Sequence, residues 1–255
     1  MKIMQTTTLL MMASLSMGTW AAEFSFDRPG SGFGTGITPV GHVAWEQGLP
    51  SATYDEQYVD GLKVRTLSLN GNMLLRSGLN EDTELQLGWQ GPSWTKTKSA
   101  GQTRETDGLG DVSIGVKKAI NLKDEQLTMA VLAQVQLATG NPGFSAKDDI
   151  YSLSSALAYR YSDLITTAMT MRYEMQDREW AVTAVPSIQY KIAENWSGFS
   201  EFVYRKAESQ PNETSLASGV MYALNDRAQL DASVGVSLSG ERPDYHGGLG
   251  VSFLF

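Results

Sequence analysis

Alternation of side-chain character is the feature that most constrains this chain. From Gly41 onward, apolar residues alternate with small or polar ones in segments of about ten residues. One segment places Leu230, Ala232, Val234, Val236 and Leu238 against Asp231, Ser233, Gly235, Ser237 and Ser239. A period of two sends successive side chains to opposite faces of a strand, whereas a helical face needs spacings of three and four. The chain is therefore predicted to be all-β.

Twelve such segments follow one another, and about ten residues is the length of a strand that crosses a bilayer. They are predicted at 41–47, 63–78, 83–90, 112–120, 126–139, 151–161, 164–175, 181–192, 196–206, 216–224, 228–239 and 247–255. Pro186 falls inside one of them and removes a ladder donor, so a bulge or local bend is expected there.

The links between these segments separate a barrel from a sandwich. Long links (48–61, 91–110, 140–150, 207–215 and 240–246, with a shorter one at 176–180) alternate with short ones that carry Asn80, Asp124, Asp163, Asn195 and Asp226 in turn positions. Long outer loops and tight periplasmic turns are typical of outer-membrane barrels, whereas Greek-key crossovers would break the rhythm. We therefore predict a closed antiparallel up-and-down transmembrane β-barrel of about twelve strands.

Aromatic residues support the same fold. Trp45, Trp89, Tyr151, Tyr173, Trp180 and Tyr204 are expected near the outer rim, and Tyr159, Tyr161, Tyr190, Trp196, Phe253 and Phe255 near the inner rim. Two aromatic levels are the girdles of a bilayer-spanning barrel. The chain also ends on the aromatic Phe255, which resembles the C-terminal signal recognised by the barrel-insertion machinery, an expected partner.

The first residues have the layout of a secretory signal. Lys2 precedes an apolar stretch from Leu9 to Trp20, and Ala21 and Ala22 follow. The apolar stretch is shorter than the ~20 residues of a spanning helix. Residues 1–22 are thus predicted to be a signal peptide and 23–255 the barrel, exported to the outer membrane of a Gram-negative cell, a destination that the absence of cysteine fits.

The charge balance excludes one class of partner. Removing Lys2 with the signal leaves 19 basic against 28 acidic residues, a formal charge of about −9. Nucleic-acid binding depends on basic residues that replace phosphate counterions, so no nucleic-acid partner is expected. Outer-membrane lipids and lipopolysaccharide remain the expected surroundings.

Several stretches resemble the Phenol MetA-pathway degradation family, outer-membrane proteins described as transporters linked to the meta-cleavage pathway of phenol degradation. They are Asp27–Gly30, the strand–turn–strand segment Arg76–Trp89, the Gly-Leu-Gly-Asp run 108–111 with its continuation to Lys117, Ala138–Gly140 with Phe144–Ser145, the Glu201 strand, and Gln229–Asp231. The resemblance covers nearly all of the mature chain, and it implies a barrel and the passage of small organic or aromatic molecules.

Polar residues on the inward faces are the candidate functional residues. Because alternate residues of a strand share a face, the residues that alternate with the apolar row should point into the lumen, an assignment that we call parity. These lumen-facing candidates are Glu46, Arg76, Glu84, Lys117, Gln134, Gln136, Arg160, Arg172, Glu174, Gln189, Lys191, Glu201, Arg205 and Asp231. They could form a constriction that selects solutes. Alternatively they could pair with one another and plug a narrow lumen, and pairing is the ordinary fate of buried charges.

Catalysis is not expected. The chain has only two histidines: His42 points inward by parity, and His246 borders an outer loop. Neither falls on the lipid-facing wall, where a phospholipase would need His with Ser, and an outer-rim protease built on Asp244 and His246 is a minor alternative. No metal-ligand spacing or phosphate loop appears, so no metal or cofactor is predicted.

These observations favour an outer-membrane channel for passive uptake of small organic solutes, aromatic ones among them. A structural or adhesive barrel with a lumen plugged by charged side chains is the alternative.

Overall fold

The computed structural model describes residues 24–208, 210–239 and 244–255, so the predicted signal peptide lies outside the described residues. Within them fifteen strands form: β1 (Val43–Val59), β2 (Leu62–Asn70), β3 (Met73–Asn80), β4 (Thr83–Trp89), β5 (Pro92–Ser99), β6 (Gln102–Leu109), β7 (Val112–Ile120), β8 (Leu127–Leu137), β9 (Ile150–Ser162), β10 (Ile165–Gln176), β11 (Glu179–Lys191), β12 (Trp196–Ala207), β13 (Glu213–Asn225), β14 (Ala228–Ser237) and β15 (Tyr245–Leu254). No helix in this part of the chain is long and apolar enough to cross a membrane.

Twelve of these strands close into an antiparallel barrel, as predicted. The order runs from β15 back to β7, then through β4 and β3 to β1, and β1 pairs with β15. The closing ladder brings Trp45 opposite Phe253, and the backbone N–H of Phe255 donates to the carbonyl oxygen of Val43 at 2.9 Å. Because the first and last strands are joined, the barrel wall has no free edge along this seam.

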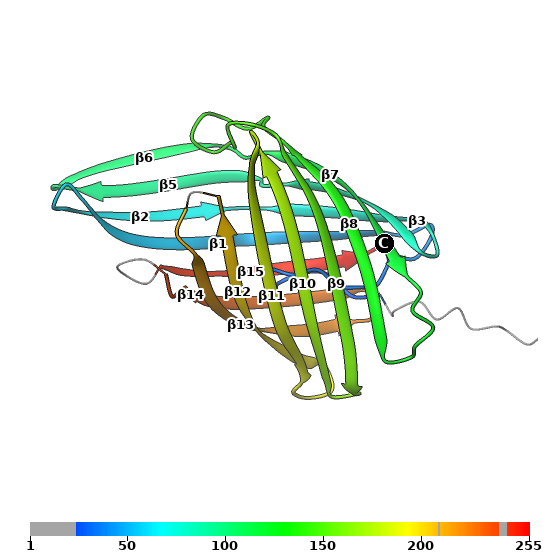
Figure 1. Cartoon of the computed structure of the whole chain (residues 1–255). Helices are drawn as coiled ribbons and strands as arrows, with labels where there is room; N and C mark the ends of the chain where they lie inside the picture. Colours follow the sequence, from blue (N-terminus) through cyan, green and yellow to red (C-terminus); the bar gives the residue numbers. More distant parts are fainter. Residues whose placement is uncertain (1–23, 209, 240–243) are drawn as a thin grey trace, which may run out of the picture.

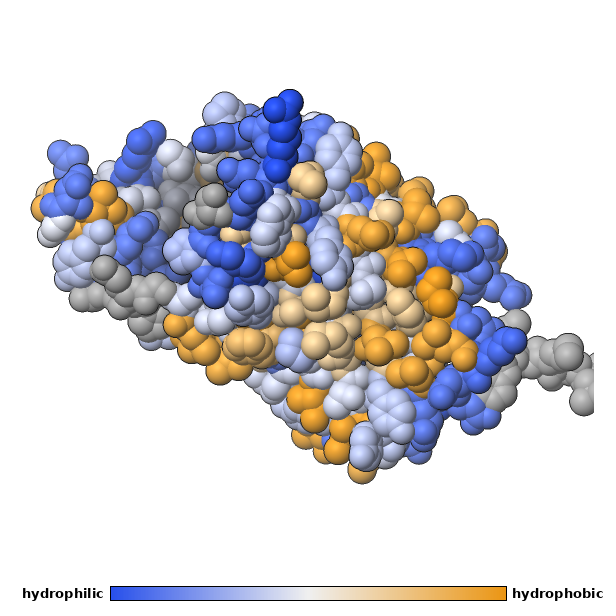
Figure 2. Space-filling model, viewed as in Figure 1, coloured by the Kyte–Doolittle hydropathy of each residue, from blue (hydrophilic) through white to orange (hydrophobic). Residues whose placement is uncertain are grey.

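The distribution of side chains is inverted relative to a soluble protein. The largest fully buried side chains are Arg76, Lys117, Glu46 and Glu84. Aliphatic residues face outward instead, with Val234 exposed by 70% and Leu249 by 58%. Figure 2 shows apolar residues gathered over the body of the barrel, with hydrophilic residues toward both ends. A surface of this kind matches hydrocarbon rather than water, so the barrel spans a membrane.

A four-stranded extension projects beyond one rim of the barrel (Figure 1). It consists of Ser51–Val59 from the outer half of β1, followed by β2, β5 and β6 in that order. The prediction of long loops at 48–61 and 91–110 was therefore wrong. β5 and β6 carry polar residues on both faces, joined across the ladder by pairs such as Lys96 with Glu105. Strands outside the bilayer need no apolar face, so a search for alternating apolar residues could not detect them.

The extension leaves the barrel along a line of aligned strand breaks. The single strand predicted at 63–78 is two strands, β2 and β3, separated at Gly71 and Asn72. At this line the N–H of Gly71 donates to the carbonyl of Pro92 at 3.0 Å, and that of Gly110 to the carbonyl of Gly91 at 2.9 Å. Gly91 has a φ of +78°, and a Cβ there would collide with the carbonyl oxygen of Gly71. Glycine thus permits the chain to turn at this level without leaving its neighbours.

Two finer predictions were wrong, the second only in part. Trp45 lies at the inner rim, stacked on Phe253 with 5.9 Å between ring centroids, because β1 continues well past the outer rim. Of the bulge or local bend expected at Pro186, the bulge does not form, and the local bend stays a prediction. β11 passes Pro186 in unbroken register with β10, and its pairing with β12 only skips Val185 and Pro186 before resuming unchanged. The missing donor is accommodated by omitting ladder bonds rather than by inserting a residue.

Candidate functional site

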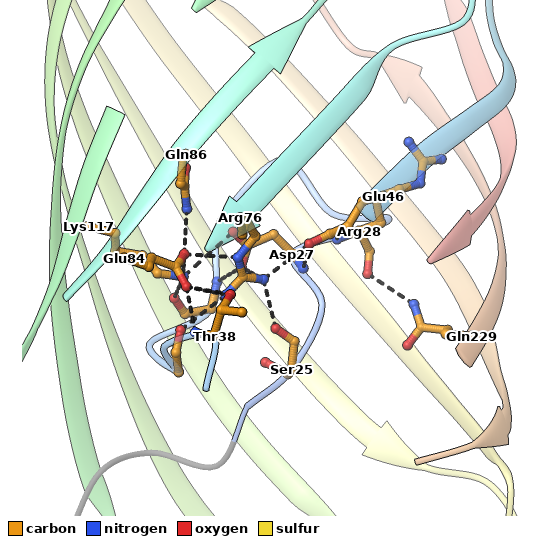
Figure 3. Close-up of polar contacts among 12 residues, drawn as sticks. Ser25, Asp27, Arg28, Thr38, Glu46, Arg76, Glu84, Gln86, Lys117 and Gln229 are labelled. Atoms are coloured by element: carbon orange, nitrogen blue, oxygen red, sulfur yellow. Dashed lines mark hydrogen bonds and ion pairs between the residues drawn. The ribbon is translucent and has the colours of Figure 1, made fainter. Parts of the chain in front are cut away.

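Residues 24–42 run through the barrel interior to its rim, at the end where Figure 1 marks the C-terminus, and Figure 3 shows Ser25, Asp27, Arg28 and Thr38 among the inner side chains. We call this the inner end, which holds the connections β3–β4, β7–β8, β9–β10, β11–β12 and β13–β14, and we call the segment 24–42 the lumen segment. It joins the wall through an isolated bridge between Val40 and Gly78 before β1 begins. A Cβ on Gly78 would collide with the carbonyl oxygen of Thr38, so this glycine permits the close approach.

A buried charge cluster fixes one side of the lumen segment. Arg76 of β3 pairs with Glu84 of β4 at 2.9 Å and with Glu46 of β1 at 3.1 Å. Its guanidinium also lies 3.4 Å from Asp27 of the lumen segment, and Lys117 of β7 lies 3.0 Å from Glu84. Four wall strands and the segment therefore share one network, whose members Figure 3 shows converging. Both signs are present and hydrogen-bonded, which is how buried charges are tolerated.

Backbone groups of the lumen segment complete the cluster. The N–H groups of Asp27 and Arg28 donate to the Glu46 carboxylate at 3.1 and 2.8 Å. Thr38 donates its N–H and its hydroxyl to Glu84 at 2.6 and 2.8 Å. The segment therefore replaces the water that these carboxylates would otherwise bind.

Three further contacts hold the segment to other strands of the wall. Arg28 pairs with Asp231 of β14 at 3.2 Å. The hydroxyl of Ser31 donates to Glu201 of β12 at 2.6 Å, and the hydroxyls of Thr35 and Thr128 lie 2.7 Å apart. Each contact links the segment to a different strand, so the segment crosses the lumen rather than following one wall.

The lumen segment borders two cavities. The inner one, of about 480 Å³, lies against β8 to β13 and is bordered by Thr128, Arg160, Gln189 and Glu201. The other, of about 370 Å³, includes Thr53, Arg172 and His246, which stand further toward the outer end. Residues Asp27, Arg28, Pro29, Gly30, Gly32 and Phe33 line both. The segment therefore stands between an inner and an outer chamber.

The structure places the fourteen parity-predicted residues in several groups. It brings Glu46, Arg76, Glu84 and Lys117 into one cluster, while Asp231 and Glu201 hold the lumen segment. The remaining contacts are Arg205 with Glu213 at 3.7 Å and with Glu174 at 3.8 Å, Gln134 with Ser113, Gln136 with Asp111, and Arg160 with the carbonyl of Glu125. In the described residues, Arg172, Gln189 and Lys191 make no side-chain hydrogen bond or ion pair. Their functional roles stay predictions.

Parity missed the lumen segment itself, including Asp27, Arg28, Ser31 and Thr38. These residues belong to no alternating segment, so a search based on strand period passes over them. A polar motif with no place in a strand, Asp27–Gly30, was the available signal.

Asp111, the last residue of the Gly-Leu-Gly-Asp run, organises the outer loop between β8 and β9. Its carboxylate accepts hydrogen bonds from Ser145 Oγ at 2.6 Å, Ala146 N at 2.8 Å, Gly140 N at 2.9 Å and Gln136 Nε2 at 3.0 Å. Burial alone would raise the pKa of this carboxyl, but the hydrogen bonds led by that of Ser145 hold its pKa below the ordinary value. Ionised Asp111 thus fixes the loop at the rim.

Asp111→Asn is expected to loosen this loop. The side-chain NH₂ of asparagine would face two hydrogen-bond donors, which should cost the loop about 2 kcal/mol of local stability. Backbone amide hydrogen exchange at Gly140 and Ala146 should then be roughly thirtyfold faster. Because the folded-state pKa is depressed, this stabilisation is present above about pH 4 and is lost as pH falls through the folded pKa. Hydrogen exchange measured by mass spectrometry tests both statements. Asp124→Asn, in an inner turn, should leave this loop unchanged; equal exchange in both variants would contradict the assignment.

A closed barrel with hydrocarbon-facing aliphatics and a charged interior defines an outer-membrane β-barrel protein. The family model described as "Putative MetA-pathway of phenol degradation" matches residues 26–255, and the chain belongs to this family. No curated protein matches the chain.

Solved structures with a similar fold include the COG4313 outer membrane channel from Pseudomonas putida F1, with a TM-score of 0.65 and 13% identity over 85% of this chain and 96% of that one. The translocator domain of autotransporter NalP from Neisseria meningitidis has a TM-score of 0.55 and 10% identity over 89% and 90%. KdgM porin has a TM-score of 0.54 and 11% identity over 83% and 98%. At these identities the similarity concerns the fold.

Proposed function

We propose that this protein is an outer-membrane channel for passive uptake of small organic solutes, aromatic ones among them, and that the lumen segment occludes it at rest. The observation that carries the proposal is the pair of chambers on the two sides of residues 27–33. A barrel that served only as a scaffold would have no need of chambers on both sides of one removable segment.

The way in which the segment is held supports displacement. Wall strands are joined by continuous ladders, for example β10 with β11 from Ile165 to Gln176. The lumen segment, in contrast, has one isolated bridge to the wall, and side-chain contacts supply its other anchors. Each such hydrogen bond contributes about 0.5–1.5 kcal/mol net between neutral groups and about 1.5–3 kcal/mol where one group is charged, because water can replace it. The segment can therefore leave while the wall stays folded.

The size and lining of the chambers indicate the solute. Volumes of about 480 and 370 Å³ lie within the range of sites for small molecules, roughly 300–1,000 Å³. Both combine apolar groups such as Phe33 with polar ones such as Arg28. The family description points to phenol degradation, and one solved structure with a similar fold is an outer membrane channel. These features favour small aromatic compounds over large polymers.

Swelling of liposomes that contain the purified full chain tests the proposal. We expect swelling with benzyl alcohol and other small neutral aromatic solutes, and faster swelling for Asp231→Asn, which removes the ion pair between Arg28 and β14. Gln229→Ala, which loses only a 3.4 Å contact to the Arg28 carbonyl, is the matched control and should behave as the parent. A barrel that stays sealed with and without the Asp231 substitution would be a plugged structural protein, and the channel proposal would fail.

Export and membrane assembly form part of the same proposal. Residues 1–22 would act as a cleaved signal peptide, and the barrel-insertion machinery would recognise β15 together with the aromatic Phe255 that follows it. Lipids and lipopolysaccharide would surround the apolar belt and the polar extension. The proposed activity contains no catalytic step, and among the described residues no group of three or more His, Cys, Asp or Glu could hold a metal ion.

A further inference from the structure

Arg172 of β10 is the exception among the lumen cations near the lumen segment. It lines the outer chamber and is half-buried, yet its guanidinium has no hydrogen bond or ion pair within the described residues. The other cations there are satisfied: Arg28 by Asp231, Arg76 by three carboxylates, and Lys117 by Glu84. An unpaired guanidinium facing a cavity has five unused N–H donors, which suit a carboxylate.

The acidic groups that border the same chamber are not available to Arg172. Glu46 is 1% exposed and is taken by Arg76 and by the N–H groups of Asp27 and Arg28. Asp27 faces Arg76 and Lys117 and accepts the N–H of Gly34 at 2.8 Å. The charge that this chamber offers to a solute is therefore positive.

The rest of the lining adds apolar contact and further donors. Phe33 and Pro29 of the lumen segment, Leu74 of β3 and Leu132 of β8 form the apolar part. The imidazole of His246 borders the chamber too, packed where a Cβ on Gly235 would otherwise stand. Aliphatic and aromatic carbon together with a free guanidinium is the combination that recognises an aromatic ring bearing a carboxylate.

We propose that the outer chamber is a binding site for small aromatic carboxylates, with Arg172 as the carboxylate-binding residue and Phe33 and Leu132 contacting the ring. The proposal rests on the channel function above and specifies its solute class. The site lies on the outer side of the lumen segment, so it concentrates the solute where the occluding contacts must be displaced. Phe33 belongs both to the site and to the segment, which gives a bound ring direct contact with the occlusion.

Benzoate and benzyl alcohol are suitable probes, because they share a ring and differ in charge. Calorimetric titration of the purified full chain in detergent measures benzoate binding whether or not the channel conducts. For Arg172→Gln we expect benzoate binding weaker by on the order of tenfold, as for the loss of one charge-assisted hydrogen bond. Liposome swelling should show slower benzoate uptake and unchanged benzyl alcohol uptake. Since Arg172 has no partner among the described residues, the substitution should leave the barrel folded.

Lys123→Gln is the matched control, because it removes an exposed cation in the inner turn between β7 and β8 and should change neither probe. Equal benzoate binding by the parent and Arg172→Gln would overturn the site, even if both probes still permeate. If neither probe permeates but benzoate binds and depends on Arg172, the site stands and the channel proposal fails. The two proposals therefore fail by different observations.

Discussion

Oxidation of a Thr35→Cys/Thr128→Cys variant is expected to abolish solute flux, and reduction to restore it. The two hydroxyls, one on the lumen segment and one on β8, lie 2.7 Å apart, so the replacing sulfurs should join under mild oxidation. The bond would tie the lumen segment to β8 and hold the chambers apart. The sequence contains no cysteine, so the introduced pair has no competing partner.

The measurement compares liposome swelling or single-channel conductance before and after reduction, with the bond verified by mass spectrometry. Thr35→Cys and Thr128→Cys alone should conduct equally in both states. Two results would count against the occluding role. One is failure of the pair to cross-link, which would show that the segment does not rest against β8. The other is unchanged flux in the cross-linked protein, which would show that solutes pass without moving the segment.

Removal of Arg76 is expected to cause the largest loss of stability of any single substitution in the lumen. The guanidinium is fully buried and lies within 3.4 Å of Asp27, 3.1 Å of Glu46 and 2.9 Å of Glu84. Arg76→Ala leaves these carboxylates with Lys117 as their main cation. Breaking a buried pair by removing one partner costs about 3–5 kcal/mol. The lumen segment should be released as well, because Arg76 also holds the carbonyl of Ser25 at 2.9 Å.

Urea unfolding of the purified barrel, followed by tryptophan fluorescence, gives the free energy of unfolding. Lys118→Ala is the matched control: its ion pair with Asp82 has a similar length, 2.9 Å, but both side chains are about half exposed. Exposed pairs contribute about 0–1 kcal/mol. If Arg76→Ala does not fold, Arg76→Lys keeps the charge and should lose less. A cost for Arg76→Ala no larger than that of Lys118→Ala would contradict the network.

Strand positions were predicted best where each strand has one face in hydrocarbon. The segment predicted at 112–120 is β7, and 83–90 differs from β4 by one residue. The same parity placed Glu46, Arg76, Glu84 and Lys117 on the inner side before any contact was known, because in a strand alternate residues must share a face. Parity failed at β5 and β6, where both faces meet water and Lys96, Thr97 and Lys98 leave no apolar row.

The functional site was predicted only in part, for a related reason. Inward parity gives a list of polar residues without saying which of them meet. Glu201 and Ser31 are separated by 170 positions in the chain, and Asp231 and Arg28 by 203. Closure of the barrel brings them together, and no local pattern encodes that distance. Strand alternation assigns both Arg172 and Arg76 to the inward face. Arg172 is nevertheless unpaired among the described residues, whereas Arg76 has three carboxylate partners.

The sequence by itself determined the class of fold, because a bilayer allows only strands whose outward residues are apolar and whose edges are joined. Only the tertiary structure decided what occupies the interior. Residues 24–42 have no strand period, and their place follows from long-range ion pairs that form once the wall has closed. Side-chain alternation is a property of one strand, whereas occlusion of a lumen depends on the whole ring of strands and the chain within it.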